Sequence, residues 1–476
     1  MINKGDVQIM NKKIIVTAVL LTISVWGSGA VSGTTPEHLK ISGPFASPMD
    51  VTRKCLECHD TAAHEVMQTS HWTWELEQDI AGQKNMFRGK KNALNNFCIS
   101  INSNWPRCTS CHIGYGWKDN NFDFNDESRV DCLVCHDTTE TYVKPGPAGG
   151  MPAGFTGNAK FDQKPVDLVA VAQNAGAPNR GNCIACHAFG GGGNNVKHGD
   201  IGSYMKSPTR DYDVHMGTDG EDFSCQSCHA TEQHNIKGNA MVVSPGGGNH
   251  LSCTDCHEGE PHDESLLNTH TARIACQTCH IPEFAKEMPT KLYWDWSTAG
   301  QDKVEADTDQ YGKETYHKNK GNFIWGKNVI PTYAWYNGKG GAYLLGDKID
   351  PGKVTRLSWP EGDRNDMSAK IYPFKVHSGK QIYDAKNNYL ITPKVFGPPN
   401  DPDAYWVTFD WKKAAAAGMK ESGLAFSGEY GFAPTDMYWR INHMVAPAEQ
   451  ALGCLDCHGD NGRLDWQKLG YKGDPM

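Results

Sequence analysis

The sequence has little of what builds long helices or crosses a membrane. Its 476 residues include 50 Gly and 25 Pro while Leu and Ile are few, which excludes a long helical bundle or a coiled coil. No long apolar run follows residues 14–26, which excludes a polytopic membrane protein. A basic surplus is also absent, because 46 Lys and Arg stand against 55 Asp and Glu, a formal net charge of −9. Nucleic acid is therefore not an expected partner, since proteins that bind it carry a basic face.

The first thirty residues have the pattern of an export signal. Lys4, Lys12 and Lys13 form a basic start, an apolar run covers 14–26, and small residues follow at 27–30. Such a run suits the apolar part of a signal peptide and is short for a membrane span. We expect residues 1–30 to be a signal peptide cleaved near residue 30 and the mature protein to be periplasmic. The alternative is an uncleaved N-terminal anchor.

Sixteen of the 17 cysteines fall into eight copies of Cys-x-x-Cys-His, numbered first to eighth along the chain. This is the attachment motif of c-type haem, in which both cysteines form thioethers and the histidine is the proximal iron ligand. Zinc sites and disulfides do not need a histidine after the second cysteine eight times. The sequence therefore predicts eight covalently bound c-type haems. The motifs are Cys55/Cys58/His59, Cys108/Cys111/His112, Cys132/Cys135/His136, Cys183/Cys186/His187, Cys225/Cys228/His229, Cys253/Cys256/His257, Cys276/Cys279/His280 and Cys454/Cys457/His458.

The motifs are unevenly spread. Seven lie in residues 31–280, residues 281–453 contain no cysteine, and the eighth returns at Cys454. So short a chain cannot build eight separate haem domains, so the haems must share one core. We expect a haem-dense region, 31–280, and a Trp- and Gly-rich wrap, 281–476, that form one continuous unit. The predicted fold is mainly α with extensive irregular loops and little sheet, a multihaem cytochrome c fold organised around eight covalently bound haems. Residues 409–421 and 434–446 are two of the expected helices.

A low-spin haem usually takes a second histidine, and twelve histidines remain outside the motifs. His38 is the weakest candidate, because it lies close to the expected cleavage site. The stronger distal candidates are His71, His198, His215, His234, His250, His262, His270, His377 and His443.

Two further residues stand out. Cys98 is the seventeenth cysteine and lies ten residues before the second motif, where a buried free thiol is the simpler interpretation. Lys197 follows a glycine run at 190–193, which would let the backbone approach a flat cofactor. A lysine can bind iron only as the neutral amine, so its pKa would have to fall. An ordinary solvated lysine is the alternative.

The chain resembles the octahaem tetrathionate reductase family of secreted multihaem cytochromes. The resemblance spans roughly residues 50–470, and the order of its motifs is more specific than any one of them. It implies that seven haems have two histidine ligands and that the second haem, on His112, is the active one. It also implies that Lys197 is the sixth ligand there, with Cys98 and Asp213 (or Asp211) in the active site. The matching stretches are Asn95–Ile99, Cys108–Trp117, Cys132–Thr139, Phe189–Asn194, Lys197–Asp200, Asp213–Gly217, Ile274–Pro282, Trp294–Gly300, Phe374–His377 and Ile441–Val445.

The function that the resemblance implies is reduction of tetrathionate, a small inorganic anion, to thiosulfate. The electron donor would be a soluble or membrane-attached cytochrome or a quinol-oxidising protein. One alternative is chemistry on nitrite or hydroxylamine, although no Cys-x-x-Cys-Lys motif occurs. A second alternative is a non-catalytic electron-transfer cytochrome. The sixth ligand of the second haem distinguishes an enzyme from a carrier.

Overall fold

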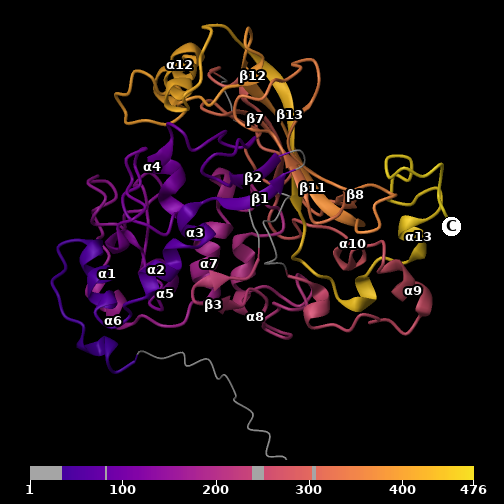
Figure 1. Ribbon diagram of the computed structural model, residues 1–476, viewed down its shortest axis with the longest axis horizontal. Coiled ribbons are helices and arrows are strands. Elements are labelled where there is room, and N and C mark those ends of the chain that lie inside the picture. Colours follow the sequence, from indigo (N-terminus) through magenta and orange to yellow (C-terminus); the bar gives the residue numbers. More distant parts are fainter. Residues whose placement is uncertain (1–34, 81–82, 239–250, 303–306) are drawn as a thin grey trace, which may run out of the picture. The chain divides into compact units, whose positions relative to one another are not determined.

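The computed structural model describes residues 35–80, 83–238, 251–302 and 307–476 (Figure 1). Residues Gly33–Met476 form one compact unit. The expected signal peptide lies outside the described residues. No helix in the described part of the chain has the length and apolar character needed to cross a bilayer.

The helices are short, and most belong to a haem motif. Each motif helix begins or ends within one turn of its cysteines, and α7 has an N-terminal cap in which the Asn179 side chain accepts from the backbone N–H of Gly181 at 2.7 Å. The predicted helix at 409–421 is confirmed as α12. The helices are α1 (Pro48–Leu56), α2 (Ala62–Met67), α3 (Ser70–Thr73), α4 (Trp105–Cys108), α5 (Leu133–His136), α6 (Leu168–Gln173), α7 (Arg180–His187), α8 (Cys225–Cys228), α9 (Ser265–His270), α10 (Cys276–His280), α11 (Tyr405–Thr408), α12 (Trp411–Glu421) and α13 (Cys454–Cys457).

The prediction of a mainly α fold with little sheet is wrong. The cysteine-free region builds a large mixed sheet in the order β6-β7-β5-β11-β13-β10-β9, with β8 and β12 also paired to β11. The predicted helix at 434–446 is also wrong, because residues 430–440 form a strand. The strands are β1 (Leu76–Ile80), β2 (Gln83–Arg88), β3 (Thr231–Glu232), β4 (Asn235–Ile236), β5 (Thr290–Asp295), β6 (Tyr316–His317), β7 (Gly321–Gly326), β8 (Thr332–Tyr336), β9 (Gly340–Ala342), β10 (Thr355–Pro360), β11 (Lys370–Asp384), β12 (Tyr389–Leu390) and β13 (Tyr430–Arg440).

Strands β11 and β13 form the centre of this sheet. They pair antiparallel without a break from Phe374 opposite Arg440 to Asp384 opposite Tyr430. The main apolar core lies against this sheet and is rich in stacked aromatic rings, including Tyr405 on Trp411 with ring centroids 3.7 Å apart. Leu94, Phe97 and Val196 of the haem-dense region belong to the same core, so the sheet packs directly against that region.

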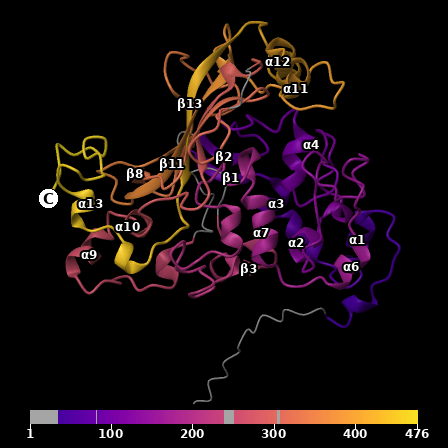
Figure 2. The same ribbon diagram turned by 180° about the vertical axis from the view of Figure 1, so that it is seen from behind.

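The last motif returns to the earlier ones in space. Seen from either side, α13 lies beside α9 and α10, whereas the helices of the first motifs lie on the other side of the sheet (Figure 2). The backbone N–H of Leu452 donates to the carbonyl oxygen of Cys279 at 3.0 Å, which joins the seventh and eighth motif segments.

Candidate functional site

Seven of the eight motif histidines face a second histidine within the described chain. The two ring centroids of each pair lie 6.1–6.5 Å apart, although the angle between the ring planes varies from 13° to 74°. A nearly constant separation with varied tilt fits one metal ion held between two imidazoles better than ring stacking. In motif order the pairs are His59–His38, His136–His234, His187–His71, His229–His443, His257–His215, His280–His262 and His458–His270.

Six of the stronger distal candidates belong to these pairs. Sequence reasoning missed His38, because its position depends on a contact far along the chain: Nδ1 lies 3.1 Å from the carbonyl oxygen of Ala175. His198 and His377 face no motif histidine among the described residues, and His250 lies outside them. The six candidates that do form pairs are His71, His215, His234, His262, His270 and His443.

Hydrogen bonds to one ring nitrogen orient several of these imidazoles. Nδ1 of His136 lies 2.8 Å from the carbonyl oxygen of Gly176, and Nδ1 of His443 lies 3.1 Å from the Asp200 carboxylate. With Nδ1 engaged, Nε2 is the nitrogen left for a metal. Burial lowers the pKa of His187 to about 3, which keeps this imidazole in the neutral form that binds iron.

The cysteines of neighbouring motifs also lie beside one another. Seven pairs of cysteine side chains from different motifs are close enough to interact, and together they give the spatial order first, third, fourth, fifth, sixth, seventh, eighth, with the second motif beside the fourth. The pairs are Cys55–Cys132, Cys111–Cys186, Cys183–Cys225, Cys253–Cys276, Cys135–Cys186, Cys228–Cys256 and Cys279–Cys457.

The two ends of this order each leave one cysteine outside the seven pairs, Cys58 in the first motif and Cys454 in the eighth. Each of these motifs has a neighbouring motif on one side only. Cys58 lies just after the end of α1, where its backbone N–H donates to the carbonyl oxygen of Cys55 at 3.1 Å. Both cysteines stay predicted attachment residues.

The second motif differs from the other seven. Its histidine, His112, is fully buried, and its ring lies 4.8 Å from Trp117 and 5.2 Å from Trp72 between centroids. Nε2 of His112 lies 2.7 Å from the carbonyl oxygen of Trp72, and Nδ1 has no hydrogen-bond partner among the described residues. Burial lowers the pKa of His112 to about 3. The predicted proximal ligand of the active haem is thus enclosed by aromatic rings, and no histidine faces it in the described chain.

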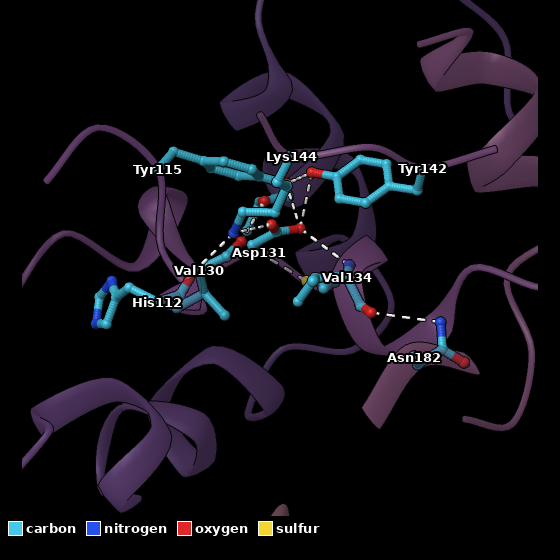
Figure 3. A network of polar contacts seen from close by, with 10 residues as sticks. His112, Tyr115, Val130, Asp131, Val134, Tyr142, Lys144 and Asn182 are labelled. Carbon is cyan, nitrogen blue, oxygen red and sulfur yellow. Dashed lines mark hydrogen bonds and ion pairs between the residues drawn. The ribbon is translucent and has the colours of Figure 1, made fainter. Parts of the chain in front are cut away.

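A buried polar network supports the backbone of His112 (Figure 3). The Lys144 ammonium lies 2.8 Å from the Asp131 carboxylate and donates to the carbonyl oxygen of His112 at 2.7 Å. The hydroxyls of Tyr115 and Tyr142 each donate to Asp131 at 3.0 Å. Burial, and then the charge of Asp131, raise the pKa of both tyrosines well above the usual value. Because Asp131 directly precedes Cys132, this network fixes the second motif against the third.

A cavity of about 610 Å³ lies beside the second motif. Cys108 and Cys111 line it together with Cys98 and Lys197, whereas the described lining does not include His112. The lining is rich in positive charge, which suits an anionic ligand. Five basic side chains, Lys90, Arg107, Lys144, Lys197 and Lys206, stand against two acidic ones, Asp137 and Glu140.

The glycine run brings Cys98 and Lys197 to one cavity. Gly191 has a φ of +76°, and a Cβ there would lie 3.2 Å from the Phe97 ring and 3.3 Å from the Cβ of Lys197. Cys98 Sγ lies 4.0 Å from the carbonyl oxygen of Gly191. The next residue, Ile99, is buried with a φ of +76°, a strained conformation for a β-branched side chain. Burial is the main cause that lowers the pKa of Lys197 to about 7, so the neutral amine is accessible near neutral pH.

Asp213 lies elsewhere. Its carboxylate accepts from the backbone N–H groups of His215 at 3.0 Å and Met444 at 2.8 Å, so it holds two loops that carry distal histidines. Neither Asp213 nor Asp211 belongs to the described lining of the cavity, and Asp211 accepts from the Gln450 side chain near the surface.

Three features together define a multihaem c-type cytochrome. The cysteines of neighbouring motifs lie beside one another, seven motif histidines each face a second imidazole at a nearly constant distance, and the motif helices are short. A family model described as bacterial cytochrome c matches residues 291–461, which cover most of the sheet. The crystal structure of an octahaem cytochrome c from Shewanella oneidensis is similar, with 56% sequence identity, a TM-score of 0.86, and coverage of 93% of this chain and 98% of that one. The chain therefore belongs to the octahaem cytochrome c family and carries covalently bound c-type haems.

A more distant relative is an uncharacterised protein of Archaeoglobus fulgidus. It is 25% identical over 282 residues, which are 49% of this chain and 93% of that protein.

Proposed function

We propose that this octahaem cytochrome is a periplasmic enzyme that reduces tetrathionate to thiosulfate at the second motif. The observation that supports this best is that the second motif faces no second histidine in the described chain and borders a cation-rich cavity. Tetrathionate is a dianion, which Lys90, Arg107 and the protonated form of Lys197 would attract, whereas Lys144 and Lys206 are paired with Asp131 and Glu140. The other motifs have two facing imidazoles, an arrangement typical of haems that only transfer electrons.

In this proposal all eight motifs would hold haem, and the seven facing histidine pairs would ligate haems that supply electron transfer to the second motif. The fourth motif is the point of delivery, since its Cys186 lies beside Cys111 of the second motif in the same cavity lining. The donor is a soluble or membrane-attached cytochrome or a quinol-oxidising protein. Several linked haems can hold electrons together, so a two-electron reduction need not await a second encounter.

The haem on the second motif supplies electrons and an iron that a neutral amine can ligate. Lys197 is the amine in the cavity, with a pKa of about 7. As the neutral amine it serves as ligand, and as the ammonium it pairs with a sulfonate group of the substrate. Arg107 and Lys90 add positive charge to the same lining.

Cys98 is the candidate nucleophile. Its thiolate attacks an inner sulfur of tetrathionate, an Sγ–S bond forms, the central S–S bond breaks, and one thiosulfate leaves. Two electrons then break the Sγ–S bond, which releases the second thiosulfate and restores the thiolate. The sum consumes two electrons and no proton. Direct reduction without thiolate attack is the alternative route.

The test is oxidation of reduced methyl viologen by the haem-loaded protein with tetrathionate, and in parallel with nitrite and hydroxylamine. We expect turnover with tetrathionate, two thiosulfates formed for each two electrons, and loss of turnover in Lys197→Ala. The matched control is Lys160→Ala, at an exposed lysine outside the cavity lining. Turnover with the nitrogen compounds alone would assign another reaction to the cavity, and no turnover with any of the three would favour an electron carrier.

A further inference from the structure

A buried lysine of the sheet holds the backbone of Lys197. Lys375 lies in β11 and is 0% exposed. Its ammonium donates to the carbonyl oxygens of Val196 at 2.6 Å and Lys197 at 3.0 Å, and to Thr290 Oγ1 at 2.6 Å. Burial lowers the pKa of Lys375 well below its usual value, and the three acceptors around its nitrogen are the contacts that offset this cost of carrying a charge.

The neighbouring backbone is held by the same group of contacts. The Thr290 hydroxyl accepts from Lys375 and donates to the carbonyl oxygen of Asn195 at 2.6 Å. Three successive carbonyls, at 195, 196 and 197, are therefore bound by one lysine and one threonine. Strand β11 and the loop that follows Lys197 approach closely, since a Cβ at Gly199 would lie 3.1 Å from Cδ of Lys375.

The sheet also contacts the other end of the Lys197 side chain. Trp439 of β13 is the cross-strand neighbour of Lys375. The Lys197 amine lies 4.7 Å from the centroid of the Trp439 ring. Lys375 thus holds the backbone of Lys197, and its cross-strand neighbour Trp439 contacts the amine of the same side chain.

Burying a charged group in a sheet is costly unless every hydrogen finds an acceptor. An apolar side chain at position 375 would avoid that cost but would leave the carbonyls of Val196 and Lys197 without these donors. The contacts of Lys375 are directed at one loop, the loop that delivers the amine to the cavity.

We propose that Lys375 is the positioning residue that fixes the Lys197 amine as the ligand of the haem on the second motif. This inference rests on the proposed role of Lys197. Lys375 acts through the backbone and touches neither substrate nor haem. Its loss leaves the other seven ligand pairs intact and changes the ligation of one haem.

The test is electron paramagnetic resonance of the fully haem-loaded, oxidised protein at one fixed pH. The signal of interest is the low-spin ferric signal that disappears in Lys197→Ala. In Lys375→Met we expect most of this signal to be replaced by a high-spin signal, with the remaining low-spin signals unchanged. Tetrathionate turnover should fall by about 10²-fold, as expected when a reacting group is displaced by about 1 Å. Lys375→Arg, which keeps the charge and the donors, should restore part of the signal.

The matched control is Lys291→Met. Lys291 is also a buried lysine of the sheet, 4% exposed, but the described contacts of its amine are with aromatic rings, at 3.3 Å from the Phe323 centroid and 3.9 Å from that of Trp294. It should keep the Lys197-dependent signal. Thr290→Val, a milder change in the same group of contacts, should shift the signal in the direction of Lys375→Met and covers the case in which that variant does not fold.

Two results would overturn the inference and separate its causes. A wild type without any signal that depends on Lys197 would refute the proposed ligand, and the positioning role with it. A wild type with that signal, retained at full intensity in both Lys375→Met and Thr290→Val, would refute the positioning role alone.

Discussion

At the scale of residues, the cavity depends on side chains that come from distant parts of the chain and meet across one glycine. Cys98 and Lys197 line the same cavity, and Gly191 contacts both regions because it has no side chain and adopts a left-handed conformation. Ile99, next to Cys98, has a strained backbone conformation, which the chain adopts where it places Cys98 at the cavity.

Replacement of Cys98 by Ser tests whether the thiol takes part in the reaction. Serine keeps the size but is a far poorer nucleophile, so we expect kcat to fall by about 10²-fold or more with KM little changed. The measurement is steady-state viologen oxidation with tetrathionate, after absorbance spectra show full haem loading. Unchanged turnover would leave direct reduction as the route.

The residues of the motifs could be read from the sequence, because Cys-x-x-Cys-His is a local pattern. The distal ligands could be read only in part, since each lies opposite its haem through tertiary contacts. His38 shows the limit: it faces His59 across a contact with Ala175. Asp213 shows a second limit. It lies near a ligand in the sequence, which suggested a catalytic role, but its carboxylate accepts hydrogen bonds from backbone N–H groups.

At the scale of elements, the pair β11–β13 forms the wall behind the candidate site. Sequence patterns did not reveal β11, because its buried face carries polar residues where alternation calls for apolar ones: Lys375, His377 and Gln381 are at most 1% exposed. These side chains hold loops of the haem-dense region, as when Nδ1 of His377 lies 2.9 Å from Oδ1 of Asn96. The wrap therefore builds the site as much as the motifs do.

Asp436 in β13 gives a pH-dependent prediction. Burial raises its pKa to about 6 despite Arg356 at 3.8 Å, and its Oδ1 has no hydrogen-bond partner among the described residues. The folded state therefore binds this proton more tightly than the unfolded state, so the contribution of Asp436 to stability falls as pH rises from about 4 to about 6.

Asp436→Asn removes this penalty. We expect Tm to rise by roughly 2 °C at pH 8 and to change little at pH 4, measured by calorimetry at both pH values. The control is Asp410→Ala, an exchange at the α12 cap, which should lower Tm, since the Asp410 carboxylate accepts from two backbone N–H groups. An equal effect of Asp436→Asn at both pH values would contradict the assignment.

At the scale of the whole molecule, the motif contacts describe a line with one side branch. The second motif touches the fourth, and the first motif lies at an end of the line beside the third. The fourth motif is therefore the point through which the branch is supplied.

Changing one distal ligand at the branch point should have a larger effect than the same change at the end. His71→Met replaces the partner of His187 in the fourth motif, which raises the potential of that haem and makes it a poorer donor to the second. We expect tetrathionate turnover to fall about tenfold. His38→Met, the same change at the first motif, is the matched control and should change turnover little. Equal effects of the two variants would contradict the inferred order.

The number of haems can be counted directly. We expect the intact mass of the mature protein to exceed that of its polypeptide by eight haems, and eight iron atoms per chain by elemental analysis. A variant with both cysteines of the eighth motif replaced by Ala should lose one haem from each count. A wild-type count of seven haems would mean that one motif carries none. The motif to examine would then be the second, because its His112 is enclosed by aromatic rings.

The pairing of His270 with His458 also has a consequence for biosynthesis. The two residues are separated in the chain by the whole sheet, so the α9 histidine has its counterpart only after the last part of the polypeptide has been made. A chain that ends before Cys454 would carry an unmatched imidazole on α9. A truncated product would therefore differ from the finished protein in the chemistry of this one histidine.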